Sequence, residues 1–345
     1  MKLRSAFFGV ASLSLGGLLI AFLVGLGKID LRETVRKVGH ADVPSFLVFT
    51  FLMAVHILLS TQKWQIIDPV IRRPSDIPVP RSTSFALSSS GIALGQFLPA
   101  AAGMAAARTL GTYVRGRAFT RGTVATIFEQ GFDFLIICFL IPASIATRVF
   151  AGGGMIWTAA AVVMSVTLLL IVSVAVRWLD RIAQRLASTR TILPARLQRG
   201  FAELHTSGLL NAKLARELAA LSILRFVILV LMAYEATRAI GVEVPIWHLA
   251  ASMPFVIFSS VIAISPGALG VSELTYATAL SLFGTPLPVA AQFALANRFL
   301  VAAASFIVAS FAAGMLFVQR ALTSTKHDAQ RLLQPEPGRT TSISP

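Results

Sequence analysis

Long uninterrupted runs of apolar residues dominate the pattern of hydrophobic and polar positions along the chain. A helix that crosses a bilayer core of about 30 Å needs about 20 consecutive apolar residues. Runs of that length cover approximately 5–27, 44–62, 122–141, 154–176, 219–240 and 289–318. The alternating segments of about ten residues that are typical of a membrane barrel do not occur in the sequence. The pattern therefore predicts an all-α polytopic membrane protein with six transmembrane helices.

Two further apolar regions, 84–114 and 247–284, are interrupted by residues that break helices. The interruptions fall at Leu98, Pro99, Gly103, Pro266, Gly267 and Gly270. Non-helical backbone at membrane depth persists only where protein surrounds it or where it lines a water-filled cavity. Since the pieces on either side of each break are too short for two spans, we predict two re-entrant helical hairpins. The alternative is a Pro-kinked span followed by an interfacial helix.

The distribution of basic residues predicts the orientation of the chain, because cytoplasmic loops are enriched in Lys and Arg. Segment 177–216 is the longest polar stretch and carries eight basic residues against Asp180 and Glu203. We therefore place it in the cytoplasm, together with a loop that begins at Lys63 and with both termini. Segments 142–153 and 241–246 fall on the opposite face, as does the mixed-charge segment 28–43.

This orientation makes the first hairpin open from the cytoplasm and the second from the opposite face. The chain then reads as an inverted repeat, with halves 1–150 and 151–320 whose breaks meet near the midplane, as in many transporters. Pro99 and Pro266, and Gly103 and Gly270, are related by one fixed offset. The first apolar run is too long for the core of a signal peptide, so we expect it to remain as a span. We expect 321–345 to form a disordered cytoplasmic tail.

The composition supports a membrane protein and argues against binding to nucleic acid. Hydrophobic residues make up 56% of the chain and charged residues 13%, whereas about a quarter of the residues of a soluble domain are charged. The net charge of +15 arises from arginines in the loops between apolar runs, in accordance with the orientation rule. Cys138 is the only cysteine, which excludes an internal disulfide or a thiolate metal site.

Ionisable residues within apolar runs are energetically costly, so each is a candidate functional residue. Glu129 and Asp133 lie four residues apart on one helical face, about 12 and 18 Å into their span. Arg298 follows Asn297 in the last span, and Arg225 lies near the start of its span, where its side chain could extend to the cytoplasmic surface. Arg108 and Glu273 lie in the second halves of the two hairpins.

These charges predict ion pairs, of Arg108 with Glu129 and Asp133 and of Arg298 with Glu273, which would offset desolvation. Such pairs could lock the hairpins to the neighbouring spans or line a polar path for a lipid headgroup. Helix N-termini near Gly103 and Gly270 would present free N–H groups to a phosphate. No catalytic motif is found, and the five histidines show no metal-ligand spacing, so we expect no enzyme activity, metal or cofactor.

Several of these motifs resemble the flippase-like transmembrane region of lysylphosphatidylglycerol synthases. The resemblance is carried by ISPGALGVSE at 264–273, FGTP at 283–286 and ANR at 296–298, and more loosely by 97–108 and FEQGFD at 128–133. The resemblance implies that four residues match charged positions of the family pattern, namely Glu129, Asp133, Glu273 and Arg298. The chain departs from the family pattern at Met104, where a charge is usual, and at Gln130, where an arginine is usual.

The resemblance covers roughly residues 5–320 and implies a role in moving lipids or lipid-linked intermediates across the bacterial inner membrane. The aminoacyl-transferase domain of the two-part synthases is not seen, and some stand-alone members accompany hopanoid or glycolipid pathways. We expect the partner to be a lipid with an anionic or phosphate-bearing headgroup, and lipid-biosynthesis enzymes to be further candidate partners. The alternatives are a small-solute or ion transporter of the same architecture and a non-transporting partner of a lipid-synthesis enzyme.

Overall fold

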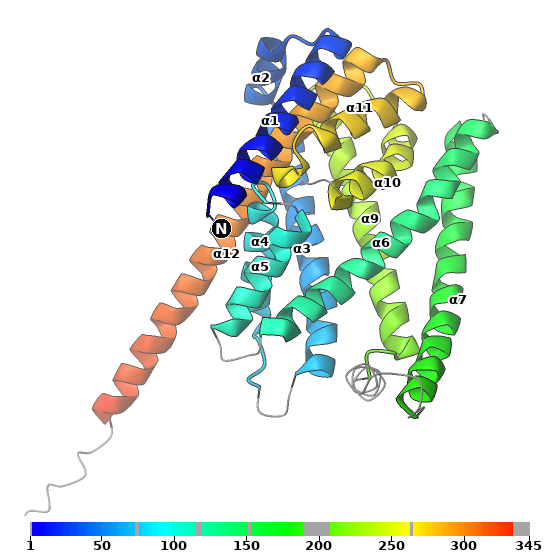
Figure 1. Ribbon diagram of the computed structural model, residues 1–345. Coiled ribbons are helices and arrows are strands. Elements are labelled where there is room, and N and C mark those ends of the chain that lie inside the picture. The colour runs from blue at the N-terminus through cyan, green and yellow to red at the C-terminus, as the bar shows by residue number, and fades with distance from the viewer. Residues whose placement is uncertain are drawn as a thin grey trace, which may run out of the picture.

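The computed structural model describes residues 2–72, 76–98, 100–114, 119–150, 153–188, 208–262 and 265–333, and these residues contain helices and no strand. Figure 1 shows long helices surrounding shorter ones at the centre of the molecule. The predicted all-α class is therefore confirmed for the described part of the chain.

Each predicted span corresponds to a long helix. These helices are α1 (Lys2–Gly27), α3 (Val43–Ile71), α6 (Phe119–Val149), α7 (Gly153–Ser188), α9 (Ala212–Ala239) and α12 (Leu287–Leu333). Five helices of the described chain are long and apolar enough to cross a membrane, or six if α1 and α2 (Leu31–Gly39) are counted together as one bent span. The chain is therefore a multi-pass integral membrane protein.

Polar caps set the starts of several helices. The carboxylate of Asp30 accepts hydrogen bonds from the backbone N–H groups of Arg32 and Glu33 at the start of α2. Asp42 accepts from the N–H of Ser45 at the start of α3. Each cap satisfies an N–H group that has no partner within its helix. The segment 28–43, which we expected to be a loop, therefore contains the short helix α2, at 98° to α1.

Two pairs of short helices occupy the interrupted apolar regions. The first hairpin consists of α4 (Arg81–Leu94) and α5 (Ala100–Tyr113), and the second consists of α10 (Ile246–Ile262), a 3-10 turn η1 (Pro266–Ala268) and α11 (Val271–Leu282). Figure 1 shows the first hairpin in the lower half of the molecule and the second in the upper half. Entry of each hairpin from one membrane face stays a prediction.

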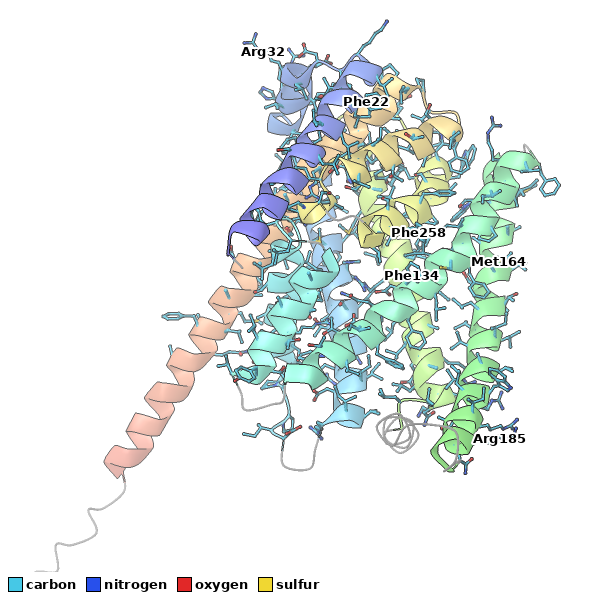
Figure 2. All side chains as sticks on the ribbon, viewed as in Figure 1. Phe22, Arg32, Phe134, Met164, Arg185 and Phe258 are labelled. Atoms are coloured by element: carbon cyan, nitrogen blue, oxygen red, sulfur yellow. The ribbon has the colours of Figure 1, made fainter. Side chains whose placement is uncertain are left out.

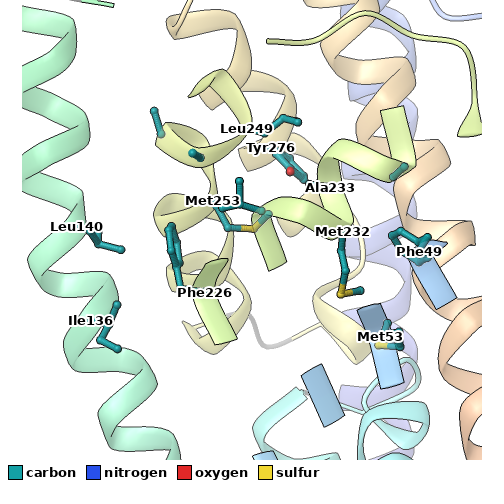
Figure 3. Packing of buried hydrophobic residues seen from close by; sticks show 14 of the residues in the cluster. Phe49, Met53, Ile136, Leu140, Phe226, Met232, Ala233, Leu249, Met253 and Tyr276 are labelled. Carbon is teal, nitrogen blue, oxygen red and sulfur yellow. The ribbon is translucent and has the colours of Figure 1, made fainter. Parts of the chain in front are cut away.

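The apolar core joins the second hairpin to the long helices. Met53 of α3, Met232 of α9, Met253 of α10 and Tyr276 of α11 are all buried in one cluster (Figure 3). On the other side of this cluster, Phe134 of α6 stacks on Phe258 of α10 with ring centroids 5.7 Å apart (Figure 2). The second hairpin thus packs against α6, α9 and α12.

Two predicted non-helical segments are partly helical. The long polar segment 177–216 begins inside α7, which continues to Ser188, and ends inside α9, which begins at Ala212. The prediction of a disordered tail is wrong for residues 321–333, because α12 continues to Leu333. Residues 189–207 and 334–345 lie outside the described residues. The ends of the apolar runs indicate only where a helix can leave the bilayer. The helical hydrogen bonds of α7, α9 and α12 continue beyond those ends.

Candidate functional site

A polar face on α3 forms one wall of the candidate site. His56, Ser60 and Lys63 follow one another at intervals of four and three residues, which places them on the same helical face. All three are buried, and Lys63 is fully buried. The prediction that Lys63 belongs to a cytoplasmic loop is therefore wrong, because α3 continues past the apolar run and carries Lys63 into the protein interior.

The side chain of Arg108 in the first hairpin forms an ion pair with Glu129 of α6. The Ser60 hydroxyl donates to Glu129 Oε1 at 2.7 Å, and Arg108 Nη2 donates to Ser60 Oγ at 2.9 Å and to Ser88 Oγ at 2.9 Å. The guanidinium also lies 5.2 Å from the ring centroid of Trp64. Because both charges are removed from solvent, these contacts offset much of the cost of their burial.

Asp133, one helical turn after Glu129, is held between two cations. Lys63 Nζ lies 2.7 Å from Asp133 Oδ1, and Arg225 of α9 pairs with Oδ2. Lys63 Nζ also donates to the backbone carbonyl of Glu129 at 3.0 Å. Asp133 therefore pairs with Lys63 and Arg225. The predicted ion pair between Asp133 and Arg108 is wrong.

Arg225, which we considered able to extend to the cytoplasmic surface, is instead directed into the protein. Its side chain is 15% exposed and is directed at Asp133, with Glu129 Oε1 at 3.9 Å. Arg225 Nη2 also lies 2.9 Å from His56 Nε2. A guanidinium only donates, so His56 accepts through Nε2 and carries its ring proton on Nδ1. The cluster contains three cations, Lys63, Arg108 and Arg225, and two carboxylates, Glu129 and Asp133.

The second hairpin turns through three residues with positive φ, at Gly267 (59°), Ala268 (57°) and Gly270 (79°). Glycine adopts this region freely, whereas the alanine does so at a cost of about 1–2 kcal/mol. Glu273 in the first turn of α11 accepts a hydrogen bond from the Gly270 N–H at 2.7 Å. We had expected free N–H groups at this helix start, but the Gly270 N–H is already occupied by Glu273.

Arg298 of α12 connects the two hairpins. Its Nη1 donates to the carbonyl of Gly267 at 2.7 Å, and its Nη2 donates to the carbonyl of Gln96 at 3.2 Å. Arg298 Nε lies 3.7 Å from Glu273 Oε1, which confirms the predicted pairing. The N–H of Gly267 also donates to the carbonyl of Leu98 at 3.0 Å. The breaks of the two hairpins are therefore in direct contact.

Gly103 has a different role from the one predicted. It lies within the first turn of α5, which begins at Ala100, and is not itself a break. A Cβ atom on Gly103 would lie 2.6 Å from the nitrogen of Gly95 and 2.9 Å from the carbonyl oxygen of Gly91. Gly103 therefore allows close packing of α5 on α4, and it does not match Gly270 in position. Pro99 lies outside the described residues.

A cavity of about 660 Å³ lies between the two hairpins. Its polar lining residues are His56, Ser60, Gln96, Glu129, Gln130, Asp133, Arg225, Ser260, Ser272, Glu273, Tyr276, Asn297 and Arg298. Apolar side chains from α3, α4, α5, α6, α9, α10 and α12 also line it. The volume is within the range of about 300–1,000 Å³ that is typical of ligand pockets.

The cavity reaches the surface of the protein between α6 and α10. Ile127 of α6 and Val261 of α10 both line the cavity, and they are 61% and 50% exposed. Ile127 lies within the candidate span Gly122–Val149. The exposed residue Ile127 therefore belongs to a part of α6 that is apolar enough to cross a membrane.

The cavity gathers most of the residues that we selected from the sequence. Glu129, Asp133, Glu273, Asn297 and Arg298 line it, whereas Arg108 lies behind Glu129. Sequence analysis did not select three other residues of this region, namely His56, Lys63 and Gln96, and it considered Arg225 only as a residue that could extend to the membrane surface. The spacing of His56, Ser60 and Lys63 was a usable signal, since it marks one polar face on an apolar helix.

The family comparison agrees with the resemblance in the motifs. The family model described as the lysylphosphatidylglycerol synthase TM region matches residues 9–311. No curated protein and no solved structure matches the sequence. The matched range contains both hairpins and all the cavity-lining residues.

Proposed function

Because the chain belongs to the lysylphosphatidylglycerol synthase transmembrane-region family, we propose that it binds a membrane lipid and moves it across the bilayer. The lipid headgroup would occupy the cavity between the two hairpins. The lining residues favour this arrangement, since they combine charged groups of α6, α9, α11 and α12 with apolar side chains. Binding and movement require no catalytic residue or cofactor.

The observation that carries the proposal is the lateral opening beside Ile127 and Val261. A lipid can place its headgroup inside the cavity only if its acyl chains can stay in the bilayer. A site for a small solute or an ion has no need of an opening toward acyl chains. The opening therefore favours a lipid over a small soluble substrate.

The charge balance favours an anionic or phosphate-bearing headgroup. Lys63, Arg108 and Arg225 exceed Glu129 and Asp133 by one positive charge, while Arg298 and Glu273 balance each other. Charges at low dielectric act strongly on one another, so a surplus cation attracts an anion into the site. Guanidinium groups also bind phosphate with favourable geometry.

We expect the protein to lie in the bacterial inner membrane with both termini in the cytoplasm. The expectation rests on the basic residues between α7 and α9 and near both ends of the chain. In this orientation the two hairpins enter from opposite faces, and their contact at Arg298 separates the two sides of the membrane.

Reconstitution into liposomes tests the proposed function. Headgroup-labelled lipids of several classes are placed in both leaflets, and a membrane-impermeant quencher then reports how quickly the inner-leaflet label becomes accessible. We expect faster exposure of at least one anionic class than in protein-free liposomes. If no class moves faster, the protein is not a lipid transporter.

The rival function is that of a non-transporting partner of a lipid-synthesis enzyme. That function would depend on the protein surface and not on the charges inside the cavity. If the protein moved no lipid in liposomes, and if neutralising Arg225 or Arg298 left the cell phenotype unchanged while surface substitutions abolished it, this rival would replace the proposal.

A further inference from the structure

The guanidinium of Arg298 is the strongest link between the breaks of the two hairpins. It donates to the carbonyl of Gly267 in the second hairpin and to the carbonyl of Gln96 in the first. The only other hydrogen bond recorded across this contact within the described chain runs from the Gly267 N–H to the Leu98 carbonyl. Release of Arg298 would therefore remove two of the three hydrogen bonds that hold the hairpins together.

The acceptors of Arg298 are weak partners for a guanidinium. Both Nη groups donate to neutral carbonyls, and the nearest carboxylate, Glu273, is 3.7 Å from Nε and already accepts from the Gly270 N–H. A phosphate carries the charge opposite to that of the guanidinium and can accept two parallel hydrogen bonds from it, whereas each of the two carbonyls is neutral. A phosphate oxygen that reached Arg298 would therefore compete well with either carbonyl.

Arg298 is accessible to such a ligand. It lines the cavity, and its side chain is 22% exposed. Glu273, by contrast, is 3% exposed. An anion that enters the cavity thus meets the guanidinium more readily than the carboxylate that would repel it.

The closed contact also contains two features that favour its release. Ala268 has a φ of 57°, which is unfavourable for a residue with a Cβ atom. The side-chain oxygen Oε1 of Gln96 is buried without a hydrogen-bond partner among the residues that the structure describes, which costs free energy in the closed state. Both penalties can be relieved when the hairpins separate.

We propose that Arg298 is a ligand-operated latch: a phosphate group in the cavity draws the guanidinium away from Gly267 and Gln96, and the hairpins then separate. This inference deepens the proposed function and rests on it, since the phosphate would belong to the transported lipid. It explains how headgroup binding at the centre of the protein opens a path between the two faces.

Reactivity of a cysteine beside the latch tests this proposal. The native Cys138 is exposed, so it is first replaced by Cys138→Ser. Ala268→Cys then places a thiol at a cavity-lining position that is 2% exposed in the closed contact. In dodecyl maltoside, Arg298→Gln should raise the labelling rate of this thiol by a small soluble maleimide on the order of tenfold, as expected for the loss of a charged hydrogen bond.

Two further variants separate release of the latch from unfolding. Arg298→Lys keeps the charge but lacks the fork that donates to two acceptors at once, so it should give an intermediate rate. Ala304→Cys, in the core of α12 and fully buried, should stay unlabelled in every background. Labelling at position 304 would show that a variant is unfolded. If Arg298→Gln were unfolded, the labelling rate of Arg298→Lys at position 268 would test the latch in its place.

Added ligands identify the source of the phosphate. In the protein that keeps Arg298, phosphatidylglycerol should raise the labelling rate at position 268 toward the rate of the Arg298→Gln variant. In the Arg298→Gln variant itself, phosphatidylglycerol should cause no further rise. A phosphate-free glycolipid should leave the rate unchanged. A rise with inorganic phosphate but not with phosphatidylglycerol would assign the latch to a soluble phosphate compound instead of a lipid.

The proposal is overturned if Arg298→Gln labels at the wild-type rate, or if the glycolipid is as effective as phosphatidylglycerol. These outcomes are independent of the transport assay. Lipid movement without a labelling response would leave the proposed function in place and remove the latch. A labelling response without lipid movement would keep the latch and remove the proposed function.

Discussion

Arg108 and Glu129 form an ion pair whose side chains are 0% and 1% exposed. Arg108 comes from the first hairpin and Glu129 from α6, so the pair fixes the short helix α5 to a long one. Hydroxyl groups of Ser60 and Ser88 complete the hydrogen bonding around it. A buried pair of this kind contributes little when intact, yet it leaves a costly unpaired charge when one partner is lost.

Glu129→Gln should therefore destabilise the protein strongly. The substitution keeps the shape of the side chain and removes the charge that neutralises Arg108. Loss of one partner of a buried ion pair typically costs about 3–5 kcal/mol. Denaturant-induced unfolding of the detergent-solubilised protein measures the change in the free energy of unfolding.

Glu33→Gln is the matched control for this substitution. Glu33 pairs with Lys37 at 3.6 Å on the surface of α2, and its side chain is 45% exposed. Exposed pairs contribute little because water screens them, so the control should unfold like the wild type. Equal stability of Glu129→Gln and Glu33→Gln would show that the buried pair does not fix the first hairpin.

Helix positions and the polar faces within single helices could be predicted from the sequence. Apolar runs identified all the long helices, and the i, i+4 spacing of Glu129 and Asp133 correctly placed both at the site. Lys63 was misassigned because the apolar run ends just before it, although its spacing from His56 and Ser60 places it on their face. Periodicity was a better guide here than the length of the apolar run.

Pairings between distant segments could not be predicted in the same way. Arg225 and Asp133 are 92 residues apart, and Arg298 and Gln96 are 202 residues apart. Which cation meets which carboxylate depends on how the helices pack, and no local pattern records it. Gly103 illustrates the same limit, since its role follows from the close approach of α4 and not from the backbone of α5.

Arg225→Gln should weaken binding of anionic lipid. The substitution removes the surplus positive charge of the cluster, because two cations, Lys63 and Arg108, then face two carboxylates, Glu129 and Asp133. Loss of one charged hydrogen bond corresponds to about tenfold weaker binding. Quenching of fluorescent phosphatidylglycerol bound to the purified protein measures the change, with phosphatidylcholine as the zwitterionic comparison.

The matched control is Arg177→Gln on α7. Arg177 is exposed and donates to the carbonyl of Ser173 in its own helix, so it has no contact with the cavity lining. This variant should bind both lipids like the wild type. Parallel weakening of phosphatidylglycerol binding in both variants would mean that overall charge, and not the cavity cluster, attracts the lipid.

Gly267→Ala should open the contact between the hairpins. Gly267 has a φ of 59°, and a Cβ atom there would overlap Arg298 Nη2 and the carbonyl oxygen of Gln96. Alanine must therefore displace the latch as well as adopt an unfavourable backbone conformation. We expect a lower free energy of unfolding, by about 1–3 kcal/mol, measured by denaturant-induced unfolding.

Gly314→Ala in α12 makes the same chemical change without these effects. No atom lies within 4 Å of the position that its Cβ would occupy. Alanine is favoured over glycine inside a helix, so this variant should be as stable as the wild type or more so. If Gly267→Ala were equally stable, the hairpin contact would be loose enough to admit a side chain.

Arg32 and Arg185 should lie on opposite sides of the membrane. They occupy the two ends of the molecule, Arg32 on α2 and Arg185 near the end of α7 (Figure 2), and both are exposed. The many basic residues that follow α7 favour the cytoplasm for Arg185. In a Cys138→Ser background, Arg32→Cys should react with a membrane-impermeant maleimide in intact cells. Arg185→Cys should react only after permeabilisation, and reaction of both cysteines in intact cells would contradict the opposed entry of the two hairpins.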